Sequence, residues 1–165
     1  MAIKQFASFH VNNNLFGIDI RLIREINRNV DITVVDSAPD FVRGLLNLRG
    51  QIVTVIDIGV RMGLREKKDI QDNCRCIVLK TSEELSAKRS EDPSIEDTSR
   101  DLVALYVDDI GDMVTMDEKE IEATPANIGD VEGKFIGGMA KLENELMIIL
   151  KMTQLLHHDE DKNAK

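Results

Sequence analysis

Apolar and polar residues alternate in short runs along most of the chain. Runs of this length, broken by Gly, Asn, Asp and Pro, are typical of β-strands. Many short strands and few helical patterns predict an all-β fold of the barrel type. We expect strands at residues 6–11, 15–18, 32–35, 45–48, 52–56, 74–79, 102–107, 110–116, 135–139 and 145–150.

The breaks between these runs predict specific turns. The three asparagines at 12–14 favour a tight hairpin, because Asn tolerates the left-handed backbone conformation. Asp19 can cap a short helical turn. Residues 23–28 fit either a helix or a strand, and periodicity alone does not decide between them. Residues 153–157 predict a final helical turn.

One hairpin carries a charge at its tip. Strands at 45–48 and 52–56 are separated by Arg49, Gly50 and Gln51, and a glycine in the left-handed region suits such a turn. Arg49 is either a solvated turn residue or a contact for other proteins. A planar, permanently charged guanidinium at a rigid tip suits a carboxylate or backbone carbonyl groups.

Residues 81–101 differ in composition from the rest of the chain. They contain five Ser, two Thr, seven acidic and three basic residues, and almost nothing to bury. We expect a mobile, acidic, Ser-rich loop inserted between two core strands, since such a segment cannot offset its ordering entropy by packing. Residues 1–156 then form one domain, followed by a polar tail at 157–165 that is expected to be frayed.

Charge and composition exclude several classes of partner. The formal net charge is −9, with no Trp and one Tyr, which disfavours nucleic acid and anionic membrane as main partners. No apolar run reaches the roughly 20 residues that span a bilayer, so we expect no membrane insertion. The start of the chain lacks the apolar region of a signal peptide, and Cys74 and Cys76 are too close in a strand to predict a disulfide. A cytoplasmic protein is the simplest interpretation.

No catalytic motif is present. The sequence has no Gly-rich phosphate-binding motif and no nucleophile elbow. Its histidines are His10, in an expected strand, and an adjacent pair in the tail, so nothing places a general base beside a nucleophile. Cys74 and Cys76 are too few ligands for zinc. We expect no catalytic residue, no metal site and no cofactor.

Several short motifs occur in a fixed order along the chain. They are residues 16–20 (FGIDI), 23–26 (IREI), 39–44 with Pro39 and FVRG, 47–50 (NLRG), 55–57 (VID), 106–110 (YVDDI), 135–139 (FIGGM) and 146–150 (LMIIL). Their order and spacing resemble the CheW family, the adaptors that couple bacterial chemoreceptors to the histidine kinase CheA. The resemblance runs through nearly the whole chain. This sequence departs from the family in the length of the 81–101 insertion and in Thr54, where a Pro is common.

The resemblance implies a fold of two side-by-side, five-stranded SH3-like β-barrels with a few short helical turns. It also implies that residues 23–28 form a strand, which would place Ile23 and Glu25 on one face. The implied function is a non-enzymatic cytoplasmic adaptor, recruited to receptor arrays. Its implied partners are the cytoplasmic tip of a chemoreceptor and the regulatory domain of a CheA-type kinase.

The same resemblance implies which residues bind partners. Arg49 lies in the family's contact region, and Asn47 belongs to the same motif. The resemblance also implies that Glu25 and Ile23 bind partners. Without it, Glu25 would be interpreted as an exposed acid and Ile23 as a core residue. Val42 and Gly44 would belong to the same patch. Gly44 is equally explained by a backbone that needs room. The alternative function is a CheW-like scaffold for another signalling or polar-localisation complex, with loop 81–101 as its docking element.

Overall fold

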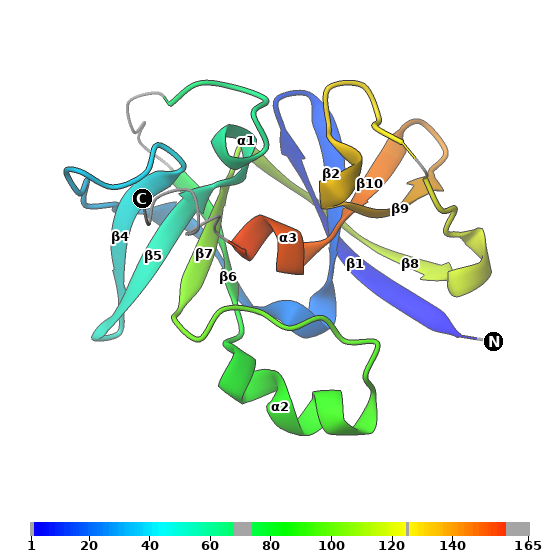
Figure 1. Ribbon diagram of the computed structural model, residues 1–165, viewed down its shortest axis with the longest axis horizontal. Coiled ribbons are helices and arrows are strands. Elements are labelled where there is room, and N and C mark those ends of the chain that lie inside the picture. Colours follow the sequence, from blue (N-terminus) through cyan, green and yellow to red (C-terminus); the bar gives the residue numbers. More distant parts are fainter. Residues whose placement is uncertain (1, 68–73, 125, 158–165) are drawn as a thin grey trace, which may run out of the picture.

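The computed structural model describes residues 2–67, 74–124 and 126–157. These residues form two five-stranded sheets, each strongly curved into a small barrel, and the two barrels lie side by side (Figure 1). The fold class expected from the sequence is confirmed. Predictions about the tail beyond residue 157 lie outside the described residues.

The first barrel is built from both ends of the chain. Its strands are β1 (Ile3–Val11), β2 (Asn14–Asp19), β8 (Asp109–Asp117), β9 (Ile136–Lys141) and β10 (Leu146–Leu150). The sheet order is β8-β1-β2-β10-β9, and only the β2–β10 pair is parallel. Asn12 and Asn13, with φ of 51° and 71°, form the turn between β1 and β2. This confirms the predicted tight hairpin, whose turn residues adopt the left-handed backbone conformation.

The second barrel is built from the middle of the chain. Its strands are β3 (Ile23–Val30), β4 (Val42–Leu48), β5 (Gln51–Asp57), β6 (Cys74–Leu79) and β7 (Val103–Val107). The sheet order is β3-β6-β7-β5-β4. The ambiguous residues 23–28 therefore form a strand. Ile23 pairs with Leu79 but Glu25 pairs with Val78, so a β-bulge at Arg24 interrupts the simple alternation from which we expected Ile23 and Glu25 to share a face.

Short helices connect and bridge the barrels. They are η1 (Ile20–Leu22), α1 (Ile58–Arg61), α2 (Ser82–Glu91), η2 (Glu118–Glu120), η3 (Gly133–Phe135) and α3 (Met152–Leu156). The Asp19 side chain accepts from the Arg21 amide and caps η1, as predicted. Among the described residues, no helix is long and apolar enough to cross a membrane.

The largest core cluster lies between the barrels rather than inside either one. It combines residues of the first barrel, such as Phe9 and Phe16, with residues of the second, such as Ile77 and Leu105. Smaller clusters fill the interior of each barrel. In β6, Cys76 faces a barrel interior while Ile77 faces the shared core, so both faces are buried. This explains the continuous apolar run in that strand.

The terminal helix α3 joins the two barrels (Figure 1). Its first amides, of Met152 and Thr153, donate to the Glu96 carboxylate at 3.0 and 3.3 Å. At the other end, the Arg61 guanidinium donates to the carbonyl oxygens of Leu155, at 3.1 Å, and of His157, at 3.0 Å. An acid at the first turn and a base at the last turn both complement the helix dipole.

The expectation of an 81–101 loop with almost nothing to bury is wrong. Residues 82–91 form α2, which begins with a capping box between Thr81 and Glu84. Leu85 and Ile95 are buried in the core between the barrels. The segment is therefore anchored to the fold by two apolar side chains that its average composition conceals.

The expected strand at residues 32–35 is also wrong. This stretch makes only a single bridge, in which the Thr33 amide and carbonyl each bond to Leu45 at 2.8 Å. Ser37 follows with φ of 65°, which turns the chain away before a longer ladder can form. β-branched residues raise the tendency to form a strand, but the available partner decides whether one forms.

Candidate partner-binding surface

The β4–β5 hairpin is closed by the two residues Arg49 and Gly50. Both have positive φ, 50° and 84°, which defines a turn whose twist matches the flanking strands. Arg49 therefore adopts the left-handed conformation itself, which the sequence alone assigned only to Gly50. The Asn47 side-chain oxygen accepts a hydrogen bond from the Gly50 amide at 3.0 Å. Asn47 thus holds the turn that carries Arg49.

Arg49 projects into solvent and keeps one internal partner. Its side chain is 70% exposed and forms an ion pair with Glu25 of β3. The Nη1 atom lies 3.4 Å from Glu25 Oε2, and Nη2 donates to Oε1. The hydrogen bond to Glu25 raises the pKa of Arg49 above its ordinary value. The arrangement orients the guanidinium without covering it.

Arg24 makes a second pair of contacts beside the Arg49–Glu25 ion pair. Arg24, in the bulge next to Glu25, donates from Nη1 to Gln51 Oε1 at 3.2 Å. Its Nη2 atom donates to Glu84 of α2. We name Glu25, Asn47, Arg49, Gly50 and Gln51, together with the neighbouring Ile52, the hairpin surface.

An apolar side chain borders these charges. Ile52 in β5, next to Gln51, is 58% exposed, whereas the exposed Ile26 of β3 lies on the opposite face of its strand from Glu25. An exposed arginine beside exposed aliphatic side chains is typical of protein-binding surfaces. We expected Ile52 within a strand at 52–56, and in β5 the buried residues are Val53, Val55, Ile56 and Asp57, so Ile52 is left exposed. The polar Thr54, two positions along, was the signal that Ile52 belongs to the outer face.

The other predicted site residues lie elsewhere. Ile23 is half-buried and packs against the core between the barrels. Val42 lies at the opposite end of β4 from the turn, roughly 20 Å away at about 3.3 Å per residue. Gly44 is buried, with φ of 149°, and an added Cβ would lie 2.1 Å from the Thr33 carbonyl oxygen. Only Glu25, Asn47 and Arg49 are brought together.

Replacing Gly44 with alanine should destabilise the fold. The positive φ and the clash with Thr33 together should cost roughly 2–3 kcal/mol and lower the melting temperature by roughly 5–10 °C. Gly63 is the matched control, because its φ is also positive, 75°, but an added Cβ meets nothing within 4 Å. Thermal unfolding followed by circular dichroism measures both. Equal melting temperatures for Gly44→Ala and Gly63→Ala would contradict the structural role of Gly44.

A buried charge network, which sequence reasoning missed, lies at the other end of the second barrel. Arg65 contacts Asp57 at 2.9 Å and Asp108 at 2.5 Å. Arg43 is almost fully buried, with its Nε atom 4.0 Å from Asp57 Oδ2. Asp108 also accepts from the Asn12 amide at 2.8 Å. The network therefore ties the β1–β2 turn of the first barrel to the second barrel, and its role is structural.

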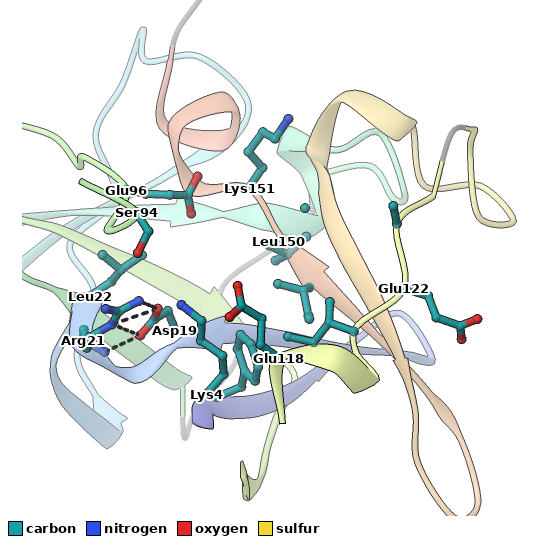
Figure 2. Close-up of a pocket in the computed structure, with 15 residues that line it drawn as sticks. Lys4, Asp19, Arg21, Leu22, Ser94, Glu96, Glu118, Glu122, Leu150 and Lys151 are labelled. Carbon is teal, nitrogen blue, oxygen red and sulfur yellow. Dashed lines mark hydrogen bonds and ion pairs between the residues drawn. The ribbon is translucent and has the colours of Figure 1, made fainter. Parts of the chain in front are cut away.

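A pocket of about 570 Å³ lies on the α2 side of the junction between the barrels. Figure 2 shows Lys4, Asp19, Arg21 and Glu118 gathered at one end, with Arg21 bonded to Asp19. Arg21 also pairs with Asp92 at 2.9 Å. The pocket's charges are of both signs, and Asp19, Arg21 and Glu96 are engaged with the protein itself, so the pocket does not define a ligand class.

Within residues 2–67, 74–124 and 126–157, no three His, Cys, Asp or Glu side chains are grouped to hold a metal ion. Burial, with a smaller contribution from Cys74, raises the pKa of Cys76 to about 12, so this thiol stays protonated. His10 lies 3.3 Å from Glu145, at the surface.

The chain is similar to known chemotaxis proteins in both sequence and structure. The CheW protein of Rhizobium meliloti is 23% identical over 161 residues, covering 98% of this chain and 92% of that protein. The Bacillus subtilis chemotaxis protein CheW is 27% identical over 157 residues, covering 94% and 88%. The crystal structure of the scaffolding protein TtCheW from Thermoanaerobacter tengcongensis matches with a TM-score of 0.74 and 26% identity, over 96% of this chain and 91% of that one.

These relatives are named as chemotaxis and scaffolding proteins, not as enzymes. Residues 5–160 match the CheW-like domain family, which spans both barrels and includes the 81–101 segment. The chain therefore belongs to the CheW-like domain family.

Proposed function

We propose that this chain is a non-enzymatic, cytoplasmic chemotaxis adaptor that couples the cytoplasmic tips of chemoreceptors to a CheA-type histidine kinase. Its membership of the CheW-like family supports the general role, and its relatives are chemotaxis proteins. The observation that carries the proposal is the exposure of Arg49 at a two-residue turn, near the exposed aliphatic side chain of Ile52. Such a surface suits a protein partner better than a small substrate.

The hairpin surface is the part of the adaptor that we assign to partner binding. Arg49 presents a guanidinium fork to a carboxylate or to carbonyl groups of the partner. Asn47 holds the turn that carries Arg49, and Glu25 orients the Arg49 side chain. Ile52 adds apolar area that becomes buried on binding.

An adaptor of this kind acts through differences in affinity. Holding receptor and kinase together changes kinase activity only if the complex prefers one state of the partners over the other. Individual contacts can be small and reversible, because many repeated contacts in an array raise the overall stability. Recruitment to membrane receptor arrays follows from the partners rather than from any insertion of the adaptor itself.

A bridging experiment tests the proposal. A chemoreceptor cytoplasmic fragment is immobilised, and the regulatory domain of the CheA-type kinase from the same organism is passed over it. We expect kinase retention to increase several-fold when the purified chain is added. Retention that is the same with and without the chain would contradict the proposal.

The alternative function, a scaffold for another complex with loop 81–101 as its docking element, needs a different test. Deleting the segment would remove Leu85 and Ile95 from the core, so loss of binding would not identify a docking peptide. Affinity capture from the native cells separates the two functions instead. Recovery of a CheA-type kinase supports the proposed adaptor, and recovery of another signalling complex without that kinase supports the alternative.

A further inference from the structure

The insertion helix α2 lies at the same end of the second barrel as the turn of the β4–β5 hairpin (Figure 1). Leu85 and Ile95 anchor the segment in the core, while Arg21 pairs with Asp92 at its far end. Thr98 adds a hydrogen bond from Oγ1 to the Lys80 carbonyl oxygen at 2.6 Å. The position of α2 is therefore fixed from several sides, and its first turn faces β3.

Glu84 occupies a specific place in this first turn. Its Oε1 atom accepts from the Thr81 amide at 3.1 Å and from Thr81 Oγ1 at 3.2 Å. The same atom accepts from Arg24 of β3. Burial alone would raise the pKa of Glu84, but the hydrogen bonds from Arg24 and Thr81 outweigh it, so the pKa is lowered and the carboxylate stays charged.

Arg24 connects this carboxylate to the hairpin surface. It is the bulge residue of β3, and a bulge redirects its side chain relative to the regular strand. One guanidinium nitrogen contacts Glu84, and the other contacts Gln51, the first residue after the turn. The next residue, Glu25, is the partner of Arg49.

Through the contacts of Arg24, the side-chain arrangement of the hairpin surface depends on the 81–101 insertion. With Glu84 in place, Arg24 is held between α2 and Gln51, and Glu25 pairs with Arg49. Without the Glu84 charge, the Arg24 guanidinium loses its anion. Its remaining contact among the described residues is then Gln51, so neither Arg24 nor Gln51 is held in its present place beside the turn.

We propose that α2 is a built-in positioning element for the hairpin surface, in which Glu84 acts through Arg24 and Gln51 to set how Arg49 is presented to a protein partner. The inference deepens the proposed function and rests on it. Arg24 and Glu84 are positioning residues in this account, and Arg49 is the contact residue.

The test uses Glu84→Gln in the full chain. Glutamine can still complete the capping box, so α2 should keep its start, while the charge that holds Arg24 is removed. Glu91→Gln is the matched control, because it makes the same change at the exposed far end of α2. Affinity for the chemoreceptor cytoplasmic fragment is measured by titration. We expect Glu84→Gln to weaken binding roughly three- to tenfold and Glu91→Gln to leave it unchanged.

A double-mutant cycle distinguishes positioning from a general structural effect. In an Arg49→Gln background, Glu84→Gln should cause no further loss of affinity, because the group that it positions is gone. The NMR signal of the Arg49 side-chain Nε–H should also shift in the free Glu84→Gln protein and not in Glu91→Gln. An equal loss in both backgrounds, or an unchanged Arg49 signal, would overturn the proposal.

Two outcomes separate the positioning role of α2 from the role of the hairpin surface as the contact. If Arg49→Gln weakens receptor binding but Glu84→Gln matches the wild type, the positioning role of α2 is refuted while the proposed function stands. If Arg49→Gln itself leaves binding unchanged, the hairpin surface is not the contact and the positioning role falls with it, while the adaptor function is decided separately by the bridging experiment.

Discussion

Arg49→Glu should strongly weaken binding to the chemoreceptor fragment, or to the kinase regulatory domain, while leaving the fold intact. The residue lies at an exposed turn, so few packing contacts are lost, and the left-handed backbone conformation costs a similar amount for either side chain. Charge reversal at a contact arginine places two like charges together across an interface. We expect affinity to fall roughly tenfold or more, by titration calorimetry.

The control for this variant is Lys141→Glu. Lys141 lies in β9 of the other barrel, its side chain is 73% exposed, and its replacement changes the net charge by the same amount. It should leave binding unchanged, since charges this far apart are largely screened. Equal losses for Arg49→Glu and Lys141→Glu would mean that net charge, and not the hairpin surface, determines binding.

Leu85→Ala should destabilise the whole protein. The side chain is fully buried in the core between the barrels, although it belongs to a segment that is otherwise polar. Truncating a buried leucine leaves a cavity, and the expected cost is about 3 kcal/mol. For a chain of this size the melting temperature should fall by roughly 6–12 °C, measured by circular dichroism.

Ser86→Ala is the comparison for this variant. Ser86 is exposed on the same helix, so its replacement should change the stability by less than about 0.5 kcal/mol. A Leu85→Ala protein that melts like Ser86→Ala would contradict the docking of α2 into the core. It would also favour the loop that the composition of residues 81–101 predicted.

The helix in the insertion could have been found from local signals. Thr81 and Glu84 have the spacing of a capping box, which marks a helix start in sequence. Leu85 follows directly as the first apolar residue. Averaging the composition over 21 residues hid this pattern, because two buried side chains are enough to anchor a short segment when a large shared core is next to it.

Most of the strands and the position of Arg49 followed from the sequence because alternation and turn residues are local properties, whereas the stretch at 32–35 forms a single bridge in place of the predicted strand. The Asn-rich turn and the Arg49–Gly50 turn were both predicted correctly as hairpins. The contacts of Arg24 and the buried pairs of Arg65 were not, since they depend on barrel closure. No spacing rule brings residue 24 beside residues 51 and 84, or residue 65 beside residue 108.

The structure leaves two roles for Arg49 that a single substitution does not separate: pairing with Glu25, or contact with a partner. The double variant Glu25→Arg/Arg49→Glu separates them, because it restores an internal ion pair of reversed orientation while presenting the opposite charge to a partner. Its affinity for the chemoreceptor fragment is the most direct test of the account. We expect the double variant to fold normally and to bind no better than Arg49→Glu alone. Recovery of wild-type affinity would mean that the internal pair, and not a surface contact, is what Arg49 provides.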